Sequence, residues 1–220
     1  MISHELKYII EKKADEIINE NKFFIFAGEG KITKNHIMHL LHNYAYALQT
    51  TSKHLKLCIK LSNNKELSLL FSEKHKEELG HDMWAFNDIK ALGSPADKIN
   101  KNFLTPTILD LMKYLEFLIK TDVRYYIIYM LTAEYSLILL GPILLDRLKK
   151  LDPTASDFLS VLYKHIELDQ YHAADGLKAA DHYFFKKEYS EIKNISKTCL
   201  DYIDQFYENL ASVMLQEDLK

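Results

Sequence analysis

This sequence has few residues that end a helix or cross-link a fold. Its 220 residues include only six glycines and four prolines. A β-rich fold with many tight turns needs more of both, so the composition favours long helices. The only two cysteines, Cys58 and Cys199, exclude a disulfide framework and a thiolate zinc site.

The sequence also lacks an excess of charge of either sign. Lysine and arginine number 28 against 31 aspartates and glutamates, which gives a net charge of −3. We therefore expect no nucleic-acid partner and no membrane anchor, since both rely on clustered basic residues. The first residues, MISHELKYII, do not have the pattern of a secretory signal. A cytoplasmic protein is the resulting expectation.

What the sequence does contain is the apolar spacing of amphipathic helices along nearly its whole length. No repeat and no long linker divides it, so we predict a single all-α domain over residues 1–220. The glycines of FFIFAGEGKIT, residues 23–33, indicate a turn. Seven helices are predicted: one beginning near Ser3, and others at about 34–61, 65–92, 107–120, 122–149 with a disturbance at Gly141-Pro142, 154–183 and 189–216.

The stretch from Tyr125 to Leu145 has 21 residues and a single charge, so it is long and apolar enough to be a candidate membrane span. Glu134 lies near its centre, where a carboxylate would be costly in lipid. A core helix of a bundle explains the same residues at lower cost. Because an unpaired buried carboxylate is itself costly, Glu134 needs either a lysine or arginine partner or a metal ion.

A second candidate is the pair Glu78-x-x-His81. Residues three apart share one face of a helix, and Glu78 lies on the apolar stripe of its predicted helix. A surface pair would not be expected there. One such motif arises often by chance, however, and is weak evidence alone.

A third candidate is the set His165, Asp169 and His172. Steps of four and seven residues return to the same helical stripe, so the three side chains would stack over two turns. The alternative is a buried histidine with satisfied hydrogen bonds beside an ordinary Asp–His pair.

These segments together place three carboxylates and three imidazoles on inward faces of three helices. Burying all six without a cation would be very unfavourable. Nitrogen and oxygen ligands without thiolate suit iron or manganese, and carboxylate-x-x-His pairs on helices are typical of dinuclear carboxylate sites. The candidate metal ligands are Glu78, His81, Glu134, His165, Asp169 and His172.

The order E-x-x-H, an isolated Glu in AEYSL, then H-x-x-x-D-x-x-H resembles the haem-oxygenase-like diiron oxidases and oxygenases over residues 34–183. The sequence His81-x-x-Trp84 also resembles the related thiaminase II and pyrroloquinoline-quinone synthase group. In some relatives, such as the chlamydial protein associated with death domains, the first Glu lies seven residues before the His. Here Lys74 holds that position, and Glu78 is interpreted as the ligand.

The resemblance implies a seven-helix haem-oxygenase-like bundle that forms a homodimer. It also implies two Fe(II) ions per chain, with manganese as an alternative at one position. Such proteins use O₂ to oxidise a small organic substrate, for example an amino acid, an amine or a fatty acid. One ion would bind Glu78, His81, Glu134 and His165. The other would bind Glu134, Asp169 and His172, with Glu78 as a candidate shared ligand.

Four other functions are also compatible with the sequence, one of them that of a non-catalytic interaction protein. A thiaminase II-like hydrolase needs a cysteine nucleophile near Glu134, where neither cysteine is expected. A quinone-synthase-like enzyme would work without metal, and a ferritin-like protein would bind iron without turning over a substrate. The candidate substrate-binding residues are His39, Lys74, Tyr125 and Tyr129, although core packing is the commoner role for such tyrosines.

Overall fold

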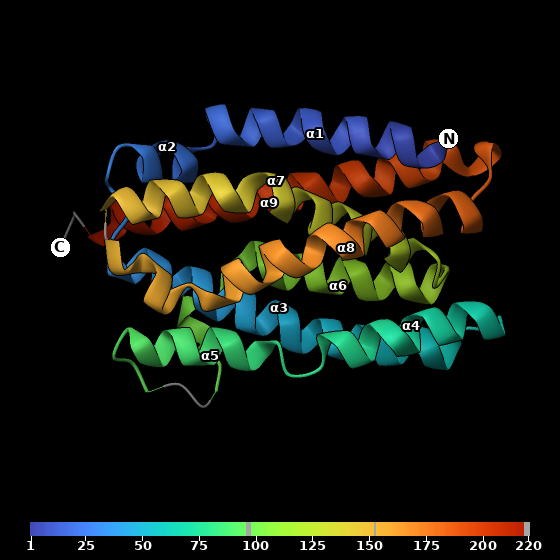
Figure 1. The fold of residues 1–220 in the computed structure, drawn as a ribbon, viewed down its shortest axis with the longest axis horizontal. Helices are drawn as coiled ribbons and strands as arrows, with labels where there is room; N and C mark the ends of the chain where they lie inside the picture. The colour runs from blue at the N-terminus through green and yellow to red at the C-terminus, as the bar shows by residue number, and fades with distance from the viewer. Residues whose placement is uncertain (96–97, 152, 218–220) are drawn as a thin grey trace.

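The computed structural model is a bundle of long helices, and it describes residues 1–95, 98–151 and 153–217 (Figure 1). These described residues form nine α-helices and three short 3₁₀ helices and contain no strand, which confirms the all-α prediction. The α-helices are α1 (Ile2–Glu20), α2 (Lys22–Gly28), α3 (Lys34–Leu61), α4 (Lys65–Glu78), α5 (Asp82–Ala91), α6 (Pro106–Thr121), α7 (Tyr125–Leu151), α8 (Ser160–Tyr183) and α9 (Tyr189–Glu217). The 3₁₀ helices are Lys101–Phe103, Pro153–Phe158 and Lys186–Glu188.

Helix α7 is central to the bundle. It packs against α1, α6, α8 and α9, while α3 packs against α4, α5 and α6 on the other side (Figure 1). Among the described residues, α7 is the one helix long and apolar enough to cross a membrane, and half of its most apolar stretch is buried inside the bundle. Its apolar length is therefore used, at least in large part, for packing against other helices.

The helix predicted over 65–92 is in fact two helices, so that prediction was wrong. Glu78 is the last residue of α4, Leu79 is extended, and Gly80 has a φ of +89°. Glycine adopts this left-handed conformation without the steric penalty that a Cβ brings. His81 then forms the N-cap of α5.

Two other segments also differ from the prediction. The segment 23–33 was expected to form a turn, but its first part belongs to the helix Lys22–Gly28, because the Asn21 side chain accepts a hydrogen bond from Phe23 N (3.0 Å) and because Phe23 and Phe24 are buried. Residues 153–158 form a 3₁₀ helix instead of the first turns of α8. The extra helix α2 and the break at Gly80 account for nine helices where seven were predicted.

The Gly141-Pro142 sequence does not disturb α7, contrary to expectation. Gly141 instead allows a close approach to α8, since a Cβ at this position would lie 2.7 Å from Ile166 Cδ1. A Cβ at Gly176 would likewise lie 3.2 Å from Leu131 Cβ. These two glycines bring α7 and α8 together on either side of Glu134.

Candidate metal centre and adjoining cavity

The structure brings the six predicted ligands into one region of the bundle. They come from the end of α4, the start of α5, the middle of α7 and two turns of α8. None is more than 13% exposed. Glu78 and His81 do not share one face of a single helix, as their spacing predicts; they face each other across a helix break, and their side chains still meet.

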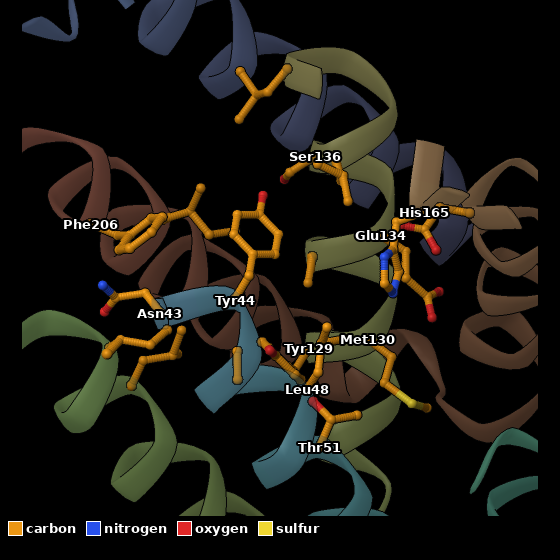
Figure 2. Close-up of a pocket in the computed structure, with 18 of the residues that line it drawn as sticks. Asn43, Tyr44, Leu48, Thr51, Tyr129, Met130, Glu134, Ser136, His165 and Phe206 are labelled. Carbon is orange, nitrogen blue, oxygen red and sulfur yellow. The ribbon is translucent and has the colours of Figure 1, made fainter. Parts of the chain in front are cut away.

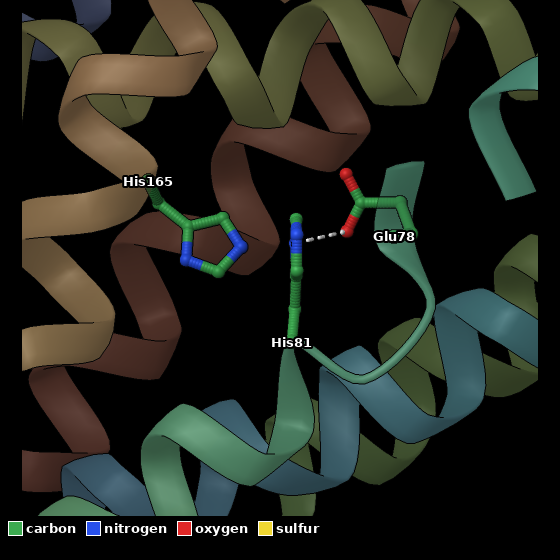
Figure 3. A group of neighbouring side chains, drawn as sticks. All are labelled: Glu78, His81 and His165. Carbon is green, nitrogen blue, oxygen red and sulfur yellow. Dashed lines mark ion pairs between the residues drawn. The ribbon is translucent and has the colours of Figure 1, made fainter. Parts of the chain in front are cut away.

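Glu78, His81 and His165 form the first donor group. Each offers one ligand atom, and the three atoms lie within 4.8 Å of one another (Figure 3). The His81 Nδ1 atom lies 3.3 Å from Glu78 Oε2. The His165 Nδ1 atom lies 2.8 Å from the Val161 carbonyl oxygen, so Nδ1–H donates there and Nε2 of the neutral ring keeps its lone pair.

Two nitrogens of this first donor group have no hydrogen-bond partner among the described residues. They are His81 Nδ1, which lies near Glu78 without hydrogen-bond alignment, and His165 Nε2. Buried polar atoms in folded proteins nearly always have a partner. Two such nitrogens beside a carboxylate are therefore suited to bind a cation.

Neighbouring side chains fix the orientation of both rings. Trp84 stacks on His81 with ring centroids 4.0 Å apart, and its edge meets His165 at 5.4 Å. Asp88 on α5 accepts hydrogen bonds from Ser160 Oγ (2.7 Å) and Val161 N (2.8 Å), which anchors the start of α8. Asp88 was not identified from the sequence, because a lone acidic residue on an amphipathic helix has no distinctive spacing.

Glu78, Glu134 and His172 form the second donor group, again with ligand atoms within 4.8 Å of one another. The His172 Nδ1 atom lies 3.3 Å from Asp169 Oδ1, so Asp169 orients this ring. Lys74 Nζ lies 2.8 Å from Glu134 Oε1. Glu134 therefore has the lysine partner that was one of its two expected partners. The same group of side chains also has the composition of a metal site.

The environments of the two groups affect their protonation differently. Burial raises the pKa of Glu134 to about 7, although Lys74 opposes the shift. Burial also acts to raise the pKa of Glu78, but His81, His165 and Lys74 outweigh it, and the pKa is lowered. Burial lowers the pKa of His165. The first donor group thus holds an ionised carboxylate and a neutral imidazole, the forms in which these groups bind metals.

A cavity of about 180 Å³ adjoins both donor groups (Figure 2). Glu78, Glu134, His165 and Asp169 form part of its wall, and most of the rest is apolar. It lies between two hydrophobic clusters of the bundle, since Leu140 and Phe206 of one and Leu111 and Tyr129 of the other line it. The lining residues not identified from the sequence include Asn43, Tyr44, Leu48, Thr51, Ser136, Leu140, Phe206 and Tyr207.

Only some of the predicted substrate-binding residues line this cavity. Tyr129 and Lys74 do. His39 instead hydrogen-bonds the Phe103 carbonyl oxygen (2.9 Å), and Tyr125 stacks on Phe184 with ring centroids 6.3 Å apart. The structure therefore places His39 and Tyr125 outside the cavity, because their helices turn these positions toward other neighbours.

The cysteines do not supply a nucleophile at the cavity. Cys58 and Cys199 are both fully buried, and neither lines it. Burial raises the pKa of Cys199 to about 12 and that of Cys58 further still. A thiolate nucleophile beside Glu134, which a thiaminase II-like mechanism requires, is thus not formed by either residue.

A second cavity, of about 250 Å³, is lined by Lys74 and Glu134 as well, together with Met130, His172 and three acidic residues. The acidic residues are Glu73, Glu77 and Asp175. We call it the outer cavity, since the side chain of Glu77 is 52% exposed. The Lys74–Glu134 ion pair is part of the wall of both cavities.

The described helices and their arrangement define a haem-oxygenase-like fold. A solved domain of unknown function from Shewanella denitrificans, described as having a heme oxygenase-like fold, matches with a TM-score of 0.88 and 15% identity over 98% of this chain and 94% of that one. The predicted fold is thus confirmed.

Two further solved structures share this fold. A TenA homolog from Pseudomonas syringae pv. tomato matches with a TM-score of 0.75 and 11% identity, covering 95% of this chain and 92% of that one. A CADD-like protein of unknown function from Nostoc punctiforme matches with a TM-score of 0.70 and 13% identity, covering 95% and 98%. No protein-family model and no curated protein matches the sequence.

Proposed function

We propose that this chain is a non-haem iron oxidase or oxygenase that uses O₂ to oxidise a small organic substrate. The observation that carries the proposal is the pair of buried nitrogens, His81 Nδ1 and His165 Nε2, that face Glu78 without hydrogen-bond partners among the described residues. The sequence motifs resemble those of diiron enzymes with this fold, and the grouped donor atoms favour a metal-binding enzyme over a metal-free one.

Iron fits the donor set because imidazole and carboxylate ligands without thiolate suit iron and manganese. We propose two Fe(II) ions per chain, with manganese as an alternative at one position. Glu78, His81 and His165 would hold one ion, and Glu134, Asp169 and His172 the other, with Glu134 and Glu78 placed to be shared. The bound metal would supply the redox chemistry with O₂.

The chain's own residues have separate parts in this proposal. Val161 fixes the tautomer of His165, and Trp84 holds the ring of His81. The apolar side chains of the cavity would exclude water from the substrate, and the cavity volume suits a small molecule with an apolar part. An amino acid, an amine or a fatty acid is the substrate class that we propose.

The remaining expectations also stay proposals. We propose a cytoplasmic homodimer that binds neither nucleic acid nor membrane. The balanced charge of the chain supports the last two points, since clustered basic residues would be needed for either partner.

The test is an anaerobic Fe(II) titration of the full chain followed by exposure to O₂, with absorbance and O₂ consumption recorded together. We expect saturable iron uptake and O₂ consumption that depends on it. The matched control is His182→Gln, which changes a histidine 59% exposed on the same helix as His165 and should alter neither. A folded protein that takes up no iron from an excess of Fe(II) would refute the proposal.

A ferritin-like function is the second candidate, because the same donor groups could bind iron without a substrate. The two functions are separated by supplying candidate amines, amino acids and fatty acids to the iron-loaded protein. Consumption of one of them with O₂ supports the oxidase. Iron that is oxidised and retained, with every candidate substrate unchanged, supports storage.

A further inference from the structure

Lys74 carries a positive charge into the candidate metal centre. Its side chain is only 12% exposed, and its Nζ lies 2.8 Å from Glu134 Oε1. Burying either charge alone would be strongly unfavourable, so the two side chains stabilise each other. The polypeptide therefore already provides one cation for the carboxylates of this site.

This ammonium lies on the same carboxylate that the second metal ion would need. Glu134 Oε1 is 3.9 Å from His172 Nδ1, so an ion held by both residues would lie close to Lys74 Nζ. The two positive charges would repel each other, and Glu134 would have to exchange one for the other. In the first donor group, by contrast, Glu78 Oε2 lies 3.3 Å from His81 Nδ1, while the ion pairs of the ammonium are with Glu134 and Glu77.

The outer cavity offers Lys74 another partner. Its Nζ already lies 3.7 Å from Glu77 Oε2, and the Glu77 side chain is 52% exposed. Glu73 and Asp175 line the same cavity, so a displaced ammonium would meet carboxylates there. Glu77 thus offers the ammonium a second carboxylate, on the side of the outer cavity.

This inference rests on the proposed metal function. We propose that the positive charge of Lys74 makes the two metal positions differ in affinity. The first ion binds at Glu78, His81 and His165. The second binds only when the Lys74 ammonium leaves Glu134 and moves into the outer cavity. Lys74 is thereby a residue that determines how many metal ions the chain holds.

The experiment is an anaerobic Co(II) titration of the full chain, read from visible absorbance and from metal content after equilibrium dialysis. For the wild-type chain we expect one tight Co(II) and a second bound at least about 10-fold more weakly, as expected for a nearby like charge. Lys74→Met should tighten the second step by at least about 10-fold and change the first far less. Lys74→Arg keeps the charge and should leave the second step weak.

Two equal binding steps in the wild-type chain would overturn the inference, as would a second step that Lys74→Met leaves unchanged or weakens. If Lys74→Met does not fold, as judged by circular dichroism, Lys74→Gln removes the charge but can still donate a hydrogen bond to Glu134, and the same criteria apply. Failure of the proposed function looks different, because neither the wild-type chain nor any variant would then bind Co(II).

Discussion

The two donor groups are built from the same kinds of side chain but are compensated differently. In the group of Glu78, His81 and His165, two buried nitrogens lack hydrogen-bond partners among the described residues. In the other group, Glu134 pairs with Lys74, and His172 lies 3.3 Å from Asp169 and 3.5 Å from Glu77. The second group is thus stabilised by the polypeptide itself, whereas the first leaves two buried nitrogens without a hydrogen-bond partner among the described residues.

The largest expected effect comes from the first group. His165→Gln removes the nitrogen that has no partner, and we expect it to weaken the tight metal-binding step by more than about 100-fold, beyond what loss of a supporting residue causes. An anaerobic Fe(II) titration measures this change. A tight step that survives in His165→Gln would show that the two groups differ for another reason.

His172→Gln tests the second donor group separately from the first. Because His172 belongs only to the second group, we expect the tight step to persist and the weak step to be lost. Metal content after dialysis at two Fe(II) concentrations distinguishes these outcomes. Loss of the tight step here would mean that the two groups act as one site.

His54 is a buried histidine that belongs to neither donor group. It is 5% exposed, and burial lowers its pKa to about 4, below the value of about 6.5 expected in the unfolded chain. Its contribution to stability is therefore complete above pH 6.5 and is lost as the pH falls toward 4, by about 2 kcal/mol between pH 8 and pH 5. Urea unfolding of wild type and His54→Leu at both pH values measures this, and equal pH slopes would contradict it.

The smallest expected effect is a loss of stability at the contact between α8 and α7, the helix that carries Glu134. Gly141→Ala would place a Cβ 2.7 Å from Ile166. Overpacking of this kind costs about 1–3 kcal/mol, and the better helix propensity of alanine offsets up to about 1 kcal/mol. Thermal unfolding should show a net loss of stability that is smaller when Ile166→Ala is also present. Additive effects of the two changes would show that this contact is not the cause.

Much of the fold follows from local sequence. The helix 34–61 was predicted with its observed bounds, because Thr33 precedes it and no glycine or proline interrupts its apolar spacing. The break at Gly80 was missed, since an isolated glycine is also tolerated inside a helix, and only tertiary packing decides between the two. The same holds for Gly141, which the sequence suggests as a break and the structure uses as a contact.

The candidate ligands could be identified from spacing, but their partners could not. Helical periodicity places Glu134 and His172 on inward faces without saying which helices meet. The contact between Lys74 and Glu134 joins two helices far apart in the chain, so the sequence assigned Lys74 to substrate binding instead. The cavity residues of α9, Phe206 and Tyr207, carry no motif because their spacing is that of any core position.

The interruption at Gly80 means that Glu78 and His81 belong to different rigid rods, joined by a short exposed linker in which Leu79 is 64% exposed. A cation bound by both side chains and by His165 would cross-link three segments of the backbone. Such a cross-link would stabilise the native chain in proportion to the logarithm of the metal concentration. Limited proteolysis at Leu79 should therefore become slower as the centre fills.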